Sequence, residues 1–205
     1  MKSVASLTAA QAMRTPIFWA VTATVVCGSL VTTALSFHQI SILGEQGLSA
    51  VEAAANFVPQ TLAGLSISLY AGAAIDRFQQ RYLMIGILTL LAVTMASVSL
   101  VQPGLRAIIF GIVLGAAQGG IRSIESGSYP KLFGVRYAGE VRGIARSFVV
   151  AASALGPLAL AFGFQLSGSY RQVLLVLLAL PVSAAALALA APEPRRASGP
   201  EAQGV

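Results

Sequence analysis

One strongly apolar segment of this chain, residues 107–129, contains an arginine and a glutamate three positions apart. On a helix, Arg122 and Glu125 share a face with Gln118 and Tyr129, within an arc of about 80° that also holds Gly111 and Gly115. Ionisable residues inside a membrane-spanning helix usually face the protein interior or a water-filled cavity. A guanidinium attracts an anion and a carboxylate can bind a proton. We therefore predict a substrate-binding site made of these four residues, with Glu125 as a candidate for proton coupling.

Two structural explanations compete with this functional interpretation. The spacing of Arg122 and Glu125 lets the two charges partly neutralise each other on one helix, so they can form a purely structural pair. An arginine can also extend its charged group toward the membrane interface while its stem stays in the apolar region.

Two other apolar segments carry polar stripes. In residues 53–75, Asn56, Gln60, Gly64 and Tyr70 fall within an arc of about 120°, and we predict that Asn56, Gln60 and Tyr70 also bind substrate. The first segment carries a stripe of hydroxyl groups on Thr22, Ser29, Thr32, Thr33 and Ser36. We expect the three stripes to surround a shared cavity. The alternative use of such residues is hydrogen bonding between helices, worth about 0.6 kcal/mol per bond on average.

The chain has one histidine and one cysteine, and this limits its chemistry. His38 lies near the outer end of the first segment, off the polar stripe, and is the second candidate for proton coupling; a packed, hydrogen-bonded histidine is the alternative. Cys27 alone excludes an internal disulfide and a cysteine zinc site. We expect no metal and no cofactor. An intramembrane enzyme is not favoured, because no serine nucleophile motif accompanies His38.

Six apolar segments must position these residues. They cover residues 17–43, 53–75, 82–101, 107–129, 144–166 and 171–191. Each has about the 20 residues that a helix needs to cross a bilayer. The chain is 56% hydrophobic and only 10% charged, whereas soluble domains have about 25% charged residues. The sequence therefore predicts an all-α membrane protein with six transmembrane helices.

Positive charge is concentrated on one side of these segments. The side that holds both termini has ten basic residues, which are Lys2, Arg14, Arg77, Arg81, Lys131, Arg136, Arg142, Arg146, Arg195 and Arg196. The other side has Arg106 and Arg171. Because cytoplasmic loops are enriched in Lys and Arg, we expect both termini in the cytoplasm. The net charge of +6 then reflects orientation in a cell membrane, expected to be the bacterial inner membrane, and not a nucleic acid partner.

The chain divides into three parts. We expect residues 1–15 in the cytoplasm or at the membrane interface, 16–192 in a six-helix bundle and 193–205 in a disordered cytoplasmic tail. Within the fourth segment, small residues recur at every fourth position, a pattern typical of close helix packing: Gly111, Gly115, Gly119, Ser123 and Gly127. In the fifth segment, Gly156-Pro157 is the most favourable place for a bend that moves, with a static kink as the alternative.

Residues 72–81 read GAAIDRFQQR and resemble the GxxxDRxxxR signature of the major facilitator superfamily, although Gln79 replaces the usual glycine. In that family the signature lies in the cytoplasmic loop after the second helix of each six-helix half, where charge alone places it here. Further segments resemble the C-terminal half of monocarboxylate- and oxalate/formate-type members; these are 15–19, 36–39, 128–134, 141–145 and 155–157. The resemblance covers about residues 15–192.

The resemblance implies solute transport by alternating access. It also implies a gating role for the loop signature, that is for Gly72, Asp76, Arg77 and Arg81. Gly156 and Pro157 are a further predicted gating element, because a proline inside a segment favours a bend. One position departs from the family pattern. Its fourth helix often has an arginine three residues before Gln-Gly, where this chain has Gly115, so Arg122 does not inherit that arginine's role.

Transporters of this family have twelve helices in two halves, with the site between the halves, and this chain supplies six. We therefore expect half of a secondary active transporter for a small solute such as an organic anion, coupled to protons. Its expected partners are the solute, the lipid bilayer and a second six-helix half, in the same longer chain, in a separate chain or in a second copy. The alternative is a non-transporting membrane module, or a truncated remnant, that assembles with other membrane proteins.

Overall fold

The computed structural model describes residues 6–192, with the exception of the Asp76 side chain. Over this range the fold is helical, without a strand. Six helical stretches are long and apolar enough to cross a membrane: Pro16–Phe37, Ala50–Ile75, Gln80–Leu100, Leu105–Phe133, Ala138–Ser167 and Tyr170–Ala190. The prediction of an all-α fold with six candidate membrane spans is confirmed. The tail expected at 193–205 lies outside the described residues.

Several of these stretches are made of more than one helix. In chain order the helices are α1 (Ala9–Met13), α2 (Pro16–Phe37), α3 (Gln39–Glu45), α4 (Ala50–Ala55), α5 (Phe57–Arg77), α6 (Gln80–Ser97), the 3₁₀ turn η1 (Val98–Leu100), α7 (Leu105–Phe133), α8 (Ala138–Ser167), α9 (Tyr170–Leu177) and α10 (Ala179–Ala190). The breaks at Asn56 and Leu178 each lie three residues before a proline, Pro59 or Pro181. A proline has no N–H for the carbonyl of the preceding turn, which favours a break there. By contrast, α8 continues unbroken through Pro157.

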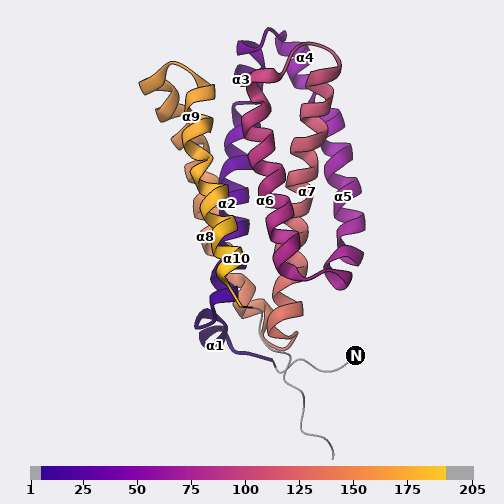
Figure 1. Cartoon of the computed structure of the whole chain (residues 1–205), viewed down its shortest axis with the longest axis vertical. Helices are drawn as coiled ribbons and strands as arrows, with labels where there is room; N and C mark the ends of the chain where they lie inside the picture. The colour runs from indigo at the N-terminus through magenta and orange to yellow at the C-terminus, as the bar shows by residue number, and fades with distance from the viewer. Residues whose placement is uncertain (1–5, 193–205) are drawn as a thin grey trace, which may run out of the picture.

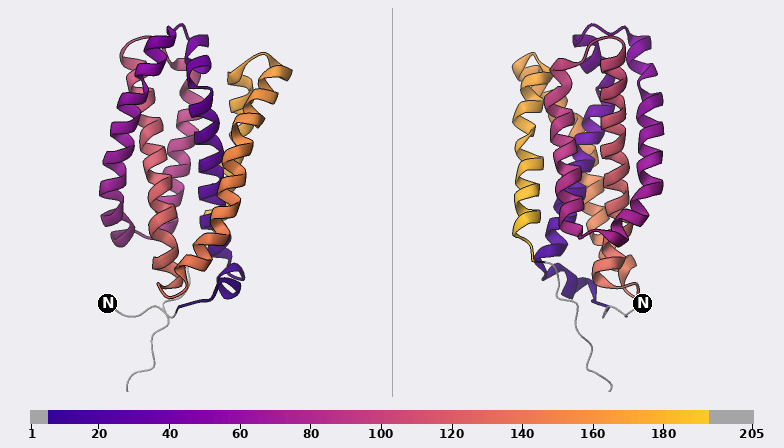
Figure 2. Two further views of the ribbon diagram at one scale, coloured as in Figure 1. Left: turned by 180° about the vertical axis from the view of Figure 1, so that it is seen from behind. Right: turned by 45° about the vertical axis from the view of Figure 1, so that its right-hand side comes forward.

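The helices α2 and α7 form the centre of the bundle (Figure 1). On one face, α6 packs against α7, and α10 packs against both α2 and α6. The outer helices are α5, which packs along α7, and α8, which packs along α2. Seen from behind, α5, α7, α2 and α8 lie side by side in a row (Figure 2, left). The helices α5 and α8 therefore flank the central pair.

The helices α5 and α7 approach each other along the row of small residues. A Cβ atom on Gly115 would lie 2.0 Å from the carbonyl oxygen of Gln60, and one on Gly119 would lie 2.4 Å from that of Gly64. Real Cβ atoms do not come this close to an oxygen, so the two backbones touch where only a hydrogen fits. The small-residue repeat therefore serves close helix packing, as the sequence indicated.

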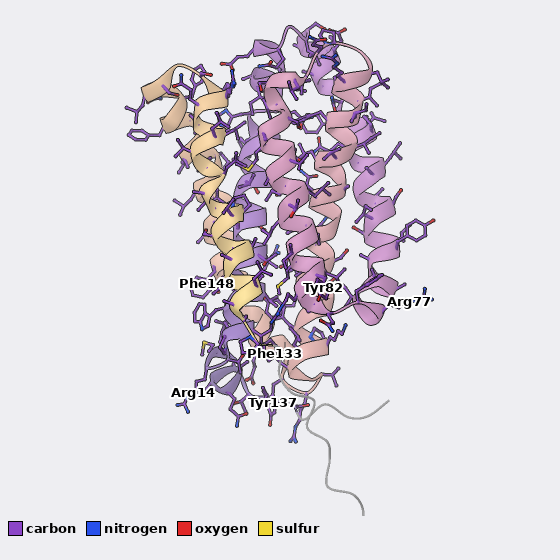
Figure 3. All side chains as sticks on the ribbon, in the orientation of Figure 1. Arg14, Arg77, Tyr82, Phe133, Tyr137 and Phe148 are labelled. Carbon is purple, nitrogen blue, oxygen red and sulfur yellow. The ribbon has the colours of Figure 1, made fainter. Side chains whose placement is uncertain are left out.

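The two ends of the bundle differ in charge. Arg14 follows α1 and Arg77 ends α5, and both lie at the lower end of the molecule (Figure 3). We call this the basic end. The loop between α7 and α8 lies at the same end, whereas Arg106 and Arg171, near the starts of α7 and α9, lie at the opposite end (Figure 1). Positive charge is thus concentrated at one end of the fold. From this concentration we predict that the basic end lies in the cytoplasm.

Candidate functional site

A cleft of about 460 Å³ lies between α2, α7 and α8, within the range of about 300–1,000 Å³ typical of small-molecule sites. One wall of the cleft belongs to α2 and presents the hydroxyl groups of Ser29, Thr32, Thr33 and Ser36. The other polar groups come from α7 and α8, namely Gln118, Arg122, Glu125, Arg146 and Ser153. The structure therefore brings most of the hydroxyl stripe of the first apolar segment into the cleft. It also brings there three of the four residues predicted in the fourth apolar segment, namely Gln118, Arg122 and Glu125.

Arg122 lines this cleft with an exposed side chain. Its guanidinium lies beside Gly64 of α5, where a Cβ atom would come within 2.9 Å of Nη2. Among the described residues, this guanidinium makes no side-chain hydrogen bond and no ion pair, and the carboxylate of Glu125 pairs with Arg146 instead. Since a guanidinium has five N–H donors and no acceptor, Arg122 can bind an anion that enters the cleft.

Glu125 forms an ion pair with Arg146 of α8. The carboxylate is largely buried, with 9% of the Glu125 side chain exposed, whereas 57% of the Arg146 side chain is exposed. The sequence left open, as the structural alternative, a pair between Arg122 and Glu125, but in the structure Glu125 pairs with Arg146 instead. The helix α8 begins at Ala138 and brings Arg146 to the level of Glu125, so the charge of Arg122 is left for the cleft.

Gln118 connects the two central helices at the cleft. Its Nε2 atom donates a hydrogen bond to Oγ of Ser36, at 2.9 Å. This contact fixes the amide of α7 against the hydroxyl wall of α2. It leaves the Gln118 side-chain oxygen as an acceptor that can bind a hydroxyl or protonated group of a ligand.

Tyr129 lies outside the cleft, although it falls on the same helical arc. It is fully buried, and its hydroxyl group lies 3.2 Å from the Thr22 hydroxyl group. Its ring packs near Phe18 and Phe133, with ring centroids 6.2 Å and 6.4 Å away. In this structure Tyr129 and Thr22 therefore join α7 to α2 within the core.

The polar residues predicted on the second segment also lie apart from the cleft. Asn56 and Gln60 are each 4% exposed, and Nδ2 of Asn56 donates to the Ala107 carbonyl oxygen at 2.5 Å. Gln60 packs beside Gly115 through its backbone. Tyr70 is 75% exposed and is not a lining residue. Asn56 therefore forms a hydrogen bond between helices, which was the alternative to substrate binding for the polar stripes.

His38 links three helices near the end opposite the basic end. Its Nε2 atom lies 3.1 Å from the Pro157 carbonyl oxygen of α8, and its Nδ1 atom lies 3.3 Å from the Tyr170 hydroxyl group of α9. The Tyr170 ring stacks on Phe164, with centroids 4.3 Å apart. His38 is therefore a hydrogen-bonded residue at a helix junction and does not line the cleft.

The residues of the predicted gating loop lie at the basic end. Gly72 and Arg77 are exposed on the last turns of α5. Arg81, in α6, donates from Nη2 to the Ala191 carbonyl oxygen at 2.8 Å, which ties the start of α6 to the end of α10. Asp76 belongs to α5, but its side chain lies outside the described part of the structure.

The Gly156-Pro157 hinge of α8 lies against α2. A Cβ atom on Gly156 would lie 2.3 Å from the Leu30 carbonyl oxygen, so the two backbones are in contact there. The Pro157 carbonyl is the group that His38 contacts. The hinge is thus positioned where a change in the bend of α8 would alter its packing on α2.

Two polar residues of the cleft were missed from the sequence, Arg146 and Ser153. Charge counting assigned Arg146 to the cytoplasmic side, because the apolar run begins at residue 144. The helix begins earlier, at Ala138, so Arg146 lies two turns inside it. The positions of Arg142, Arg146, Val149 and Ser153 differ by four, three and four residues, which indicates a single helical face and was the available signal.

No protein-family model matches this chain, and no curated protein matches it in sequence. The class of the protein is therefore defined by the structure itself. It is a helical protein with six stretches able to cross a membrane, and a polar, positively charged cleft lies between three of its helices.

Proposed function

We propose that this protein is one half of a secondary active transporter of the major facilitator type, which moves a small organic anion across a cell membrane by alternating access. The observation that carries the proposal is the Arg122 guanidinium, exposed in a hydroxyl-lined cleft of a bundle with six candidate membrane spans. An arginine held at membrane depth is costly unless it faces water, a partner or a ligand.

The chemistry of the cleft suits a carboxylate. A guanidinium binds a carboxylate through charge-assisted hydrogen bonds, which are about twice as strong as bonds between neutral groups. The hydroxyl groups of Ser29 and Thr33 are potential donors to further oxygen atoms of the solute. Binding is thereby selective for negative charge and tolerant of the rest of the molecule.

A second six-helix half covers the cleft in this proposal. The outer helices α5 and α8 present large exposed apolar side chains, among them Leu62, Leu69, Leu158 and Phe162. Lipid is compatible with these side chains but not with the charged groups between the two helices. A second half placed over this face completes the cavity, and rocking of the two halves exposes it to each side in turn. The basic end lies in the cytoplasm.

Proton coupling is proposed at Glu125, with His38 as the second candidate. Protonation of Glu125 removes its attraction for Arg146 and leaves a second guanidinium free for the anion. Binding of a proton at Glu125 thus increases the affinity for the anion, and binding of the anion favours the protonated form. His38 acts on the cavity only indirectly, through α8 and α9.

The test is uptake of radiolabelled acetate, lactate and oxalate by vesicles that contain the protein. Arg122→Ala is expected to lower uptake by roughly tenfold or more, since a hydrogen bond to a charged group contributes about 1.5–3 kcal/mol. Arg14→Ala is the matched control, because Arg14 is an exposed arginine outside the cleft. Glu125→Gln is expected to abolish the dependence of uptake on a pH gradient, while His38→Gln retains it.

Unchanged uptake in Arg122→Ala would show that the site assignment is wrong. Absence of uptake for every anion, from a chain that inserts normally and is paired with a second copy in the vesicle, would favour the other function considered, a membrane module that assembles with other proteins and transports nothing itself.

A further inference from the structure

A second hollow of about 450 Å³ lies nearer the basic end, beside the first two turns of α8. It is lined by Gly139, Arg142, Gly143 and Arg146. Their spacing of three and four residues places all four on one helical face, over a length of about 10 Å at 1.5 Å per residue. The hollow therefore follows a single strip of α8.

The two glycines keep this strip open. A Cβ atom built on Gly139 or Gly143 would have no neighbouring atom within 4 Å. Close packing of α8 thus does not explain the glycines. Their effect is to leave the space beside the guanidinium groups of Arg142 and Arg146 unfilled.

Arg146 lines both this hollow and the main cleft. Its contact with Glu125 runs through one nitrogen, Nη1. More than half of the Arg146 side chain remains exposed, at 57%, so its other N–H donors are available to a second ligand. Arg142, one turn nearer the basic end, is exposed and has no side-chain hydrogen bond or ion pair among the described residues.

We propose that Arg142 and Arg146 form an outer subsite for a carboxylate at the mouth of the cleft, where the solute is held on its way to or from Arg122. The inference rests on the proposed function, since it assigns the same anionic solute to both positions. Arg142, Arg146 and Arg122 then form a series of guanidinium groups from the basic end into the cleft. The anion can then move from one guanidinium group to the next and is paired with a cation at every step.

The charge balance supports an anion at this mouth. Glu125 offsets one positive charge through its pair with Arg146. Glu140 is the other acidic residue near the start of α8, but it is two positions from Arg142 and therefore does not share its helical face. Arg122 adds its charge on the cleft side. One carboxylate of the solute therefore enters a region with excess positive charge.

The experiment measures how fast phenylglyoxal, an arginine reagent, modifies each arginine of the full chain, with peptide mass spectrometry as the readout. The protein is placed in zwitterionic phosphatidylcholine nanodiscs at constant ionic strength, with and without acetate or oxalate. We expect either anion to slow modification of Arg142 by roughly two- to fivefold, as suits a partly exposed ion pair. Arg14, an exposed arginine at the same end, is expected to react at an unchanged rate.

Two variants separate the subsite from the cleft. In Arg122→Ala the protection of Arg142 is expected to persist, because the outer subsite does not need Arg122. In Gly143→Leu the protection is expected to disappear although every charge is retained, because the new side chain fills the hollow. Gly143 lies in an exposed part of a helix, where leucine is a better helix former than glycine.

The other outcomes overturn the subsite in recognisable ways. Protection of Arg122 without protection of Arg142 leaves the cleft intact and removes the outer subsite. Protection of Arg142 that requires phosphatidylserine in the nanodisc identifies a lipid headgroup site instead. Equal rates at Arg142 with and without both anions also reject the subsite. Protection of Arg142 in a protein that transports none of these anions retains the subsite and rejects the proposed function.

Discussion

The charged residues of the cleft differ in how much each depends on its neighbours. Arg122 is exposed to the cleft and can remain hydrated there. Glu125 is almost enclosed and relies on Arg146 for a counter-charge. A buried charge that loses its partner is much more costly than a pair in which both members are removed. The stability of the protein should therefore respond to the two members of this pair unequally.

We predict that Arg146→Ala lowers the free energy of unfolding by about 1–2 kcal/mol, less than for a fully buried pair because solvent screens the arginine. Glu125→Gln should cost less, below about 1 kcal/mol, since the amide is neutral and still forms hydrogen bonds. The double variant should be more stable than Arg146→Ala alone. Unfolding of the purified protein in detergent measures these differences, with Arg14→Ala as the control. Equal stabilities of Arg146→Ala and the control would contradict the proposed dependence.

Residue patterns predicted the face of the site but not its full composition. The arc through Gln118, Arg122 and Glu125 does line the cleft. Tyr129 lies on the same arc but meets Phe18 and Phe133 instead, because a long helix passes different neighbours along its length. Arg146 was missed for a related reason. Charge counting placed it with the cytoplasmic residues at the start of the run 144–166, whereas α8 begins at Ala138 and brings it beside Glu125.

At the scale of the elements, hydropathy predicted all six spans because bilayer thickness sets their length. It did not predict the breaks at Asn56 and Leu178, since a proline inside an apolar run is compatible with a kink, a break or a continuous helix. Pro157 is an example of the last case. A close helix contact of α7 was predictable, because a row of small residues has few other uses in a membrane helix. That α5 is the partner comes from the structure alone.

This contact yields a second prediction. Gly115→Ala places a methyl group 2.0 Å from the Gln60 carbonyl oxygen, so α5 must move away from α7, at a cost of about 1–3 kcal/mol for overpacking. Gly86→Ala in α6 is the matched control, because its Cβ atom would meet nothing within 4 Å. The control should be neutral or stabilising by up to about 1 kcal/mol, since alanine favours the helix. Thermal unfolding of both variants measures the difference. A Gly115→Ala protein as stable as Gly86→Ala would show that α5 is free to shift.

At the scale of the whole molecule, the arrangement of polar and apolar surface implies two environments. Most of the cleft side chains of α2, α7 and α8 are polar or charged, whereas Val182 on α10 and Leu158 on α8 are large, apolar and exposed. In the proposed transporter, water reaches the cleft while lipid or a second half covers the rest. A thiol reacts with maleimides as the thiolate, which forms in water and not in hydrocarbon. Introduced cysteines can thus distinguish the two environments.

We expect Ser153→Cys, on the cleft wall of α8, to react with a membrane-impermeant maleimide when the reagent reaches the side of the membrane from which the cleft is filled. Val182→Cys, with 62% of the residue exposed on α10, should stay unreactive although it is the more exposed position in the isolated chain. The natural protein supplies the background control, because Cys27 is buried and should not react. The measurement is mass-shift labelling in intact membranes, before and after solubilisation in denaturant, which shows that each cysteine is present and competent. If Ser153→Cys stays as unreactive as Val182→Cys in membranes, the cleft is not filled with water. The charges of Arg122 and Arg146 would then require a covering partner even in the resting state.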